Sequence, residues 1–168
     1  FDAVSFLCGT APIEMEYEAQ AAMRLEAAAS VRTRASYSYA FLDEARPFRI
    51  SFVPTVREIV EDKKRLTPAC LMASKFHNTL AHVILAAAER AKRDYGIETV
   101  SLAGGCFLNK RLLTGTERLL GRNGFTVLRT DAYSPNDESL SLGQIAFALA
   151  SVAVAAAGNA HEGPVRGR

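Results

Sequence analysis

The sequence has no strong excess of charge of either sign and no long apolar run. Its 20 basic and 18 acidic residues give a net charge of +2, so charge offers no argument for binding nucleic acid or an anionic membrane. No uninterrupted apolar run approaches the roughly 20 residues that a membrane span requires. The first residues lack a basic segment before an apolar run, so we expect no secretory signal. These absences predict a cytoplasmic protein with no membrane or nucleic-acid partner.

Cysteine and histidine are also scarce. The three cysteines, Cys8, Cys70 and Cys106, are odd in number and far apart, so we expect reduced thiols rather than a metal or redox pair. Cys106 follows a glycine pair, which leaves a nucleophilic role open, but we favour the interpretation that it packs as a small apolar side chain. His77 and His82 are five residues apart. A helix would turn them about 140° away from each other, so they should not bind one metal ion.

The residues that are present predict an α/β lobe. Hydrophobic residues make up 49% of the 168, enough for a substantial core in one domain or one lobe of a larger domain. The chain begins within an apolar helical pattern, so we expect a piece of a longer protein. Helices alternating with strands predict an α/β layer structure. We expect helices at 1–8, 14–29, 54–64, 68–95, 109–120 and 140–157, strands at 31–42, 47–53, 100–103 and 125–128, and a disordered tail at 158–168 after a lobe at 1–157.

Several residues predict where helices begin and end. Gly9 and Gly96 are expected stops, because glycine adopts the left-handed conformation that ends many helices. Thr67 and Pro68 are an expected N-cap and first helical residue. The acidic segment 14–18 suits the positive end of the dipole of the second helix.

The stretch from Thr99 to Asn109 organises the chain. A short buried strand breaks at Gly104 and Gly105 and leads at once into a helix. Such a turn presents backbone N–H groups to an anion or a nucleotide. Glycine suits this turn because a Cβ would block both the tight bend and a close approach. Many turns of this kind bind nothing, so the pair alone leaves both interpretations open.

A second turn carries Asp137. Its carboxylate is either the N-cap of the following helix or a group that faces hard cations and phosphates. Ligands of open α/β sheets bind beyond the carboxyl ends of the strands. Both this turn and the glycine turn follow predicted strands, so we expect them to lie at one edge of the sheet.

His77 and Asn78 form a polar pair within the apolar pattern of the longest helix. Both side chains can bond either a ligand or a backbone group. For His77 the pattern by itself favours a structural role.

Five stretches in order, FDAVSFLCG, YEAQAAMRLE, KFHNTLA, LAGGCFLNKRLL and SPNDESLSLGQ, resemble the last part of the carbamoyl-transfer domain of the hydrogenase maturation carbamoyltransferase family, HypF. The resemblance runs from residue 1 to about residue 150. It implies one lobe of an actin-like ATPase (RNase H-like) fold. It also implies binding of ATP or carbamoyl-adenylate, which an adenylate-forming domain elsewhere makes from carbamoyl phosphate. The carbamoyl group would pass to the C-terminal cysteine of a HypE-like acceptor protein during [NiFe]-hydrogenase maturation.

The resemblance also assigns roles to residues that match these motifs. It implies Asp137 as one ligand of a divalent metal ion whose other ligands lie upstream of this chain, in the first half of the same domain. The implied catalytic residues are His77 and Asp137, and the implied nucleotide-binding residues are Gly104, Gly105, Asn109, Asn78, Glu18 and Gln20.

The sequence departs from the family pattern at Ala19, where the family usually has glycine, and at Glu138 and Ser139, where it has a glycine pair. The resemblance also implies that the other metal ligands, a histidine pair, and the adenylate-forming domain lie outside this sequence, so we expect that the chain alone does not catalyse the complete reaction. Two other interpretations stay open. One is a related transferase that carbamoylates a sugar hydroxyl or threonylcarbamoylates tRNA. The other is a non-catalytic nucleotide-binding or docking remnant.

Overall fold

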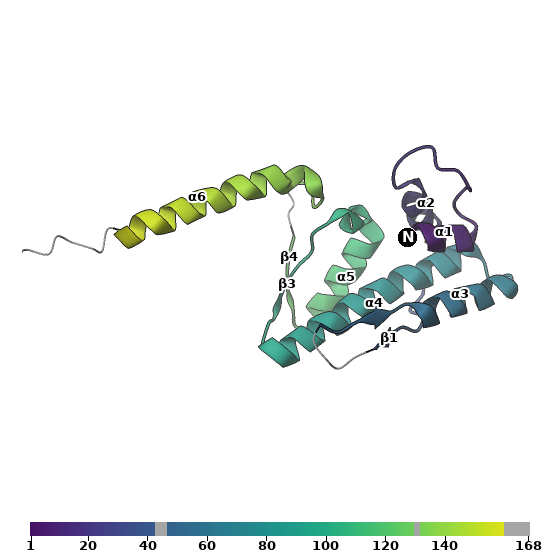
Figure 1. Ribbon diagram of the computed structural model, residues 1–168. Coiled ribbons are helices and arrows are strands. Elements are labelled where there is room, and N and C mark those ends of the chain that lie inside the picture. Colours follow the sequence, from purple (N-terminus) through teal and green to yellow (C-terminus); the bar gives the residue numbers. More distant parts are fainter. Residues whose placement is uncertain (43–46, 130–131, 160–168) are drawn as a thin grey trace, which may run out of the picture.

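The structure is a computed structural model that describes residues 1–42, 47–129 and 132–159, with side chains as far as 152. Helices dominate, and the strands are short (Figure 1). The helices are α1 (Asp2–Cys8), α2 (Gln20–Ala28), α3 (Val53–Lys64), α4 (Ala69–Tyr95), α5 (Lys110–Arg122) and α6 (Leu140–Asn159), with 3₁₀ helices η1 (Gly105–Leu108) and η2 (Asp137–Ser139). The strands are β1 (Ala40–Phe41), β2 (Ile50–Ser51), β3 (Thr99–Ser101) and β4 (Thr126–Leu128).

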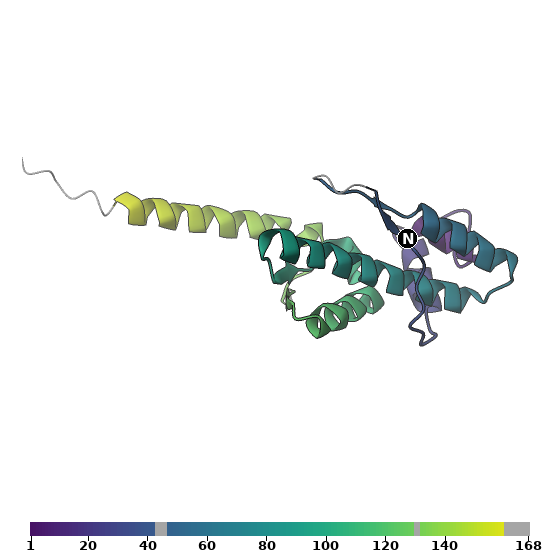
Figure 2. The same ribbon diagram turned by 90° about the horizontal axis from the view of Figure 1, so that it is seen from below.

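Helix α4 is the longest element, with 27 residues, and helices α1, α2, α3 and α5 pack against it (Figures 1 and 2). It ends where predicted, at Gly96 in the left-handed conformation with φ 69°. The expected cap at Thr67 is wrong. Pro68 takes the N-cap position without a side-chain cap, because the Thr67 hydroxyl instead donates to Asp62 Oδ1 at 3.4 Å.

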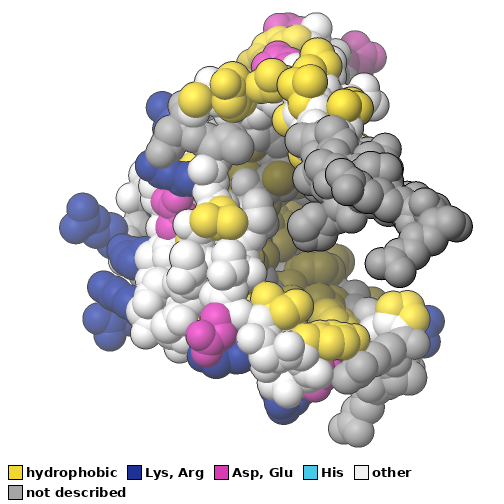
Figure 3. Space-filling view, turned by 90° about the vertical axis from the view of Figure 1, so that its left-hand side faces the viewer, with side chains coloured by type: hydrophobic (Ala, Val, Ile, Leu, Met, Phe, Trp, Pro, Cys, Tyr) yellow, Lys and Arg dark blue, Asp and Glu magenta, His cyan; other side chains and the backbone are white. Residues whose placement is uncertain are grey.

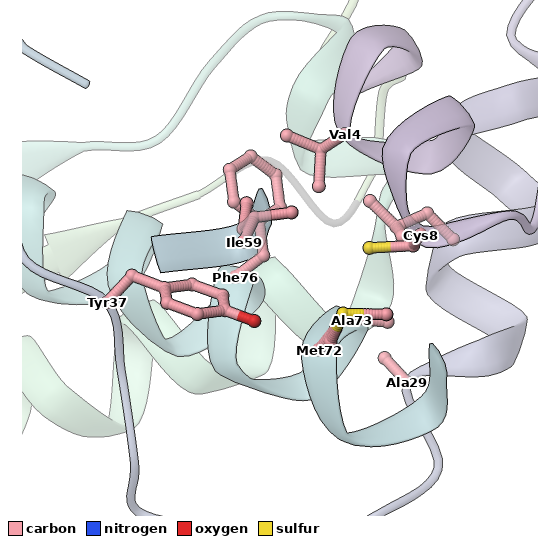
Figure 4. Close-up of a cluster of buried hydrophobic side chains, with 9 residues drawn as sticks. Val4, Cys8, Ala29, Tyr37, Ile59, Met72, Ala73 and Phe76 are labelled. Atoms are coloured by element: carbon pink, nitrogen blue, oxygen red, sulfur yellow. The ribbon is translucent and has the colours of Figure 1, made fainter. Parts of the chain in front are cut away.

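Two hydrophobic clusters lie along α4, one toward each end. The first joins α4 to α1, α2 and α3, and Figure 4 shows its side chains. It consists of Val4, Cys8, Leu25, Ala29, Tyr37, Ile59, Met72, Ala73 and Phe76. The second cluster lies between α4, α5 and the parallel strands, and consists of Ala88, Leu102, Leu120 and Phe125. Helix α4 therefore joins the N-terminal helices to the parallel strands, of which β3 leads into the glycine turn.

The parallel strands β3 and β4 pair in register, with Val100 opposite Val127. The connection between them runs through η1 and α5, so the expected strand, turn and helix are all present. The predicted α/β fold class is confirmed.

The predicted strands at 31–42 and 47–53 shrink to the two-residue antiparallel pair β1 and β2. Side chains of neighbouring helices bind the backbone before β1 and take the place of strand partners. Tyr37 N donates to Thr79 Oγ1 of α4 at 2.8 Å, and Thr55 Oγ1 of α3 donates to Ser38 O at 2.6 Å.

Helix α2 begins at Gln20, six positions later than the predicted Glu14. The segment 14–18 therefore lies outside the helix, and the expected interaction of its acidic residues with the first turn is wrong. The helix cannot extend backward because Ala19 is left-handed, with φ 61°. The Gln20 side chain instead closes the preceding loop, accepting a hydrogen bond from Glu16 N at 2.9 Å.

Replacing Ala19 with glycine should stabilise the chain by about 1 kcal/mol, because a left-handed φ costs an alanine roughly that much. Urea denaturation of the 168-residue chain measures the change. Ala27→Gly is the matched control, since Ala27 is exposed within α2 and glycine costs about 0.5–1 kcal/mol inside a helix. Two changes of the same sign would contradict this interpretation of Ala19.

Helix α6 leaves the body of the molecule (Figures 1 and 2), and Figure 3 shows hydrophobic side chains on the side toward which it points. Its large apolar side chains are exposed: Leu140, Leu142, Ile145, Phe147, Leu149 and Val152. Nonetheless, none of the helices in the described part of the chain has the length and hydropathy to cross a bilayer. The helix runs to Asn159, so 158 and 159 are helical, whereas 160–168 of the predicted tail lie outside the described residues.

Candidate functional site

The glycine turn follows directly from β3. Gly104 has φ 99° and ψ 157°, a conformation that a residue with a Cβ rarely adopts. Gly105 opens η1 without a positive φ, and a Cβ placed there would meet no atom within 4 Å. The bend itself therefore requires glycine at Gly104 only, whereas Gly105 leaves open space beside the backbone.

The second turn lies against the first. Gly104 N donates a hydrogen bond to Pro135 O, so the backbone itself joins the two turns. This confirms that they lie at one edge of the sheet. Asn136 caps η2, accepting from Glu138 N at 3.1 Å, and the alternative that Asp137 is the cap is therefore wrong. The exposed Asp137 carboxylate makes no hydrogen bond or ion pair within the described residues.

A cleft of about 540 Å³ lies between these turns and α6. The residues of α6 that line the cleft recur at intervals of three or four positions. They therefore lie on one face of the helix, which forms a wall of the cleft. The complete lining is Leu102, Ala103, Gly104, Ser134, Pro135, Asn136, Asp137, Ser139, Leu140, Gly143, Gln144 and Phe147. The segment LSLGQ carries this spacing in the sequence, but spacing alone could not show which face of α6 borders the cleft.

The departures at Glu138 and Ser139 affect this cleft differently. Glu138 is exposed and does not line it. Ser139 does, and its hydroxyl donates back across the turn to Ser134 O at 2.7 Å. The serine thus closes the turn that presents Asp137.

His77 and Asn109 meet in the interior although 32 residues separate them. Asn109 Nδ2 lies 2.9 Å from His77 Nε2, and His77 Nδ1 lies 2.7 Å from Ala73 O. A carbonyl oxygen can only accept, so Nδ1 carries the proton and Nε2 accepts from Asn109. Burial lowers the pKa of His77, while its bond to Ala73 O opposes that shift. The imidazole is therefore neutral at pH 7, with both nitrogens occupied.

The other predicted nucleotide-binding residues lie away from the cleft lining. Asn78 Nδ2 donates to Thr33 O at 2.8 Å and to Ala35 O at 2.9 Å, which fixes the segment before β1. Gln20 is buried at the start of α2, and Glu18 is exposed in the loop before it. The structure thus brings Gly104 and Asp137 together at the cleft. Gly105, His77 and Asn109 do not line it, and neither do Asn78, Gln20 and Glu18.

The cysteines are free thiols, as expected, but Cys106 is exposed. The preference for apolar packing at Cys106 is therefore wrong, because no residue of η1 is buried. Within the described residues no group of three or more His, Cys, Asp or Glu side chains could hold a metal ion. Asp137 can contribute one oxygen ligand, but any metal site needs further ligands from outside this set.

Comparison with known proteins identifies the family. The family described as "Carbamoyltransferase, Kae1-like Domain, second subdomain" matches residues 1–144. The chain belongs to the HypF carbamoyltransferase family. HypF of Synechocystis sp. is 33% identical over 146 residues, which are 86% of this chain and 18% of that protein. A HypF homolog of Cupriavidus necator is 29% identical over 166 residues, covering 96% of this chain and 42% of its own length.

A crystal structure of full-length HypF in the phosphate- and nucleotide-bound form superposes with a TM-score of 0.81 at 35% identity. The match covers 86% of this chain and 19% of that HypF chain. The chain spans about a fifth of the length of HypF from Synechocystis and of HypF2 from Cupriavidus necator, at 18% and 21%. The resemblance to HypF and the expected fold are confirmed.

Proposed function

We propose that this chain supplies one wall of the nucleotide site of a HypF-type carbamoyltransferase, with Gly104 and Gly105 facing ATP or carbamoyl-adenylate. The observation that carries the proposal is the bond from Gly104 N to Pro135 O, which holds two strand-end turns beside one cleft. Strand ends of this kind are where α/β proteins bind nucleotides. A HypF relative of the same fold was solved with phosphate and nucleotide bound.

Asp137 is proposed to contribute a carboxylate ligand to a divalent metal ion, with the remaining ligands from the preceding half of the domain. Such an ion would polarise phosphate and carbamoyl oxygens. The carbamoyl group would come from carbamoyl phosphate through an adenylate-forming domain and pass to the C-terminal cysteine of a HypE-like protein. The match to HypF over residues 1–144 favours this acceptor over a sugar hydroxyl or tRNA.

Gly105→Val tests the nucleotide site, because Gly105 has no positive φ and an added Cβ meets no atom of the described residues within 4 Å. In a HypF-type enzyme that carries this chain, the substitution should weaken ATP binding at least tenfold by calorimetry. Gly115→Val in α5 is the matched control, since a Cβ there also meets nothing within 4 Å. Equal affinities of the two variants would refute the assignment of Gly105 to the nucleotide.

A further inference from the structure

A buried chain of hydrogen bonds runs from α4 to the end of the glycine loop. His77 connects Ala73 O to Asn109 Nδ2, at 2.7 and 2.9 Å. Asn109 Oδ1 then accepts from Leu112 N at 2.8 Å, which caps α5. The side chain of His77 is almost fully buried, with 2% of the residue exposed, and Asn109 is 9% exposed.

In this series of hydrogen bonds, each polar side-chain atom of His77 and Asn109 has one fixed role as donor or acceptor. The His77 Nδ1 proton points at a carbonyl, so Nε2 must accept, and the Asn109 amide must present its NH₂ group there. The same orientation directs Asn109 Oδ1 at Leu112 N. Neither side chain can turn toward a ligand without leaving a buried polar group unpaired, which is costly. The aromatic rings of Phe1 and Phe76 flank the imidazole, with centroids at 5.6 and 6.3 Å.

We propose that His77 and Asn109 form a clamp that fixes the conformation of the loop 104–109, whose first residue, Gly104, lines the cleft. His77 is then a positioning residue that acts through Asn109, not a catalytic residue that touches substrate. The bond from Gly104 N to Pro135 O fixes the other end of the loop. Between the two ends, η1 is held by local backbone bonds such as Phe107 N to Gly104 O at 3.0 Å. The clamp itself does not depend on the proposed function, and only its effect on nucleotide affinity rests on that function.

Amide hydrogen exchange of the 168-residue chain tests the clamp in the absence of any nucleotide. Asn109→Ser is the decisive variant, because a serine can still cap α5 but is too short to reach His77. We expect exchange of the Phe107 amide to accelerate at least tenfold while the Leu112 amide stays protected. Unchanged exchange at Phe107 would overturn the clamp.

Substitutions of His77 provide a second test of the clamp by hydrogen exchange. His77→Leu removes the acceptor and should accelerate exchange at Phe107, whereas His77→Gln offers a side-chain oxygen near the position of Nε2 and should restore protection. His82→Leu is the matched control on the same helix, since His82 is half-buried and lies outside the chain of bonds. If His77→Leu fails to fold, Asn109→Ser and His77→Gln still decide the question. Faster exchange in His77→Gln than in His82→Leu would count against the acceptor role.

Nucleotide affinity separates this inference from the proposed function. In a HypF-type enzyme that carries the chain, His77→Leu should weaken ATP binding at least tenfold and His77→Gln should restore it. If Gly105→Val leaves ATP binding unchanged, the nucleotide site is wrong, while hydrogen exchange still tests the clamp. If Gly105→Val weakens binding but Asn109→Ser changes neither exchange nor affinity, the clamp alone is wrong.

Discussion

Asp137→Ala, introduced into a HypF-type enzyme that carries this chain, is expected to lower the rate of carbamoyl transfer on the order of 100-fold or more. The expectation follows from the proposed metal role, because a metal ion supplies several kcal/mol of charge stabilisation in the transition state. Adenylate formation, proposed to occur in another domain, should be unaffected. Radiolabelled carbamoyl phosphate would allow both steps to be followed in one assay.

The structure makes Asp137→Ala a test of function rather than of folding. The Asp137 carboxylate is exposed and has no partner within the described residues, and the cap of η2 belongs to Asn136. Glu138→Ala is the matched control, because this neighbouring acid is also exposed but does not line the cleft. Asp137→Asn keeps the size and removes the charge, so it should resemble alanine. Normal transfer by both Asp137 variants would exclude the proposed metal ligand.

The parts of the fold that could be predicted from the sequence are those that local chemistry decides. Gly9 and Gly96 end helices because each adopts a left-handed conformation, with φ 74° and 69°. The apolar pattern of α4 and the strand before Gly104 are equally local signals. The meeting of the glycine turn and the Asp137 turn was also predictable, since both follow strands that pair in parallel.

The features that could not be predicted depend on contacts between distant residues. Thr67 is a good N-cap by residue type, but the nearby Asp62 takes its hydroxyl. The segment before β1 has strand-like residues, yet Thr79 and Asn78 of α4 bond its backbone. The start of α2 depends on a left-handed alanine, which residue type argues against.

The candidate site likewise has features that local sequence predicts and features that depend on contacts between distant residues. The glycine turn and Asp137 are evident from motifs, whereas the wall that α6 contributes depends on which of its faces borders the turns. The link between His77 and Asn109 spans 32 residues and two helices. No local pattern joins them, although each lies within a stretch that resembles HypF. The resemblance assigned His77 to catalysis and Asn109 to the nucleotide, whereas the proposed clamp gives both residues a role in supporting the loop.

The second large effect is expected at Asp62, which joins α3 to α4 and bonds Tyr37 of the first hydrophobic cluster. Its Oδ2 accepts from Lys75 Nζ at 2.6 Å and from the Tyr37 hydroxyl at 2.9 Å. The side chains of Asp62 and Lys75 are only 14% and 18% exposed. Asp62→Ala leaves a cation and a buried phenol without their acceptor, so it should cost about 2–4 kcal/mol of unfolding free energy. Urea denaturation of the 168-residue chain measures this loss.

Glu61→Ala is the control, because the adjacent Glu61 pairs with Lys64 at the surface, where both side chains are more than half exposed. Solvent screens such a pair, so this variant should unfold like the unsubstituted chain.

Burial alone would raise the pKa of Asp62, but the bonds from Lys75 and Tyr37 outweigh it and hold that pKa below the ordinary 3.8. The stabilisation is therefore present above pH 3.8 and is lost as the pH falls through the lower folded-state pKa. The free-energy difference between Asp62→Ala and the unsubstituted chain should shrink on acidification, and a difference that stays constant would mean that Asp62 contributes only packing.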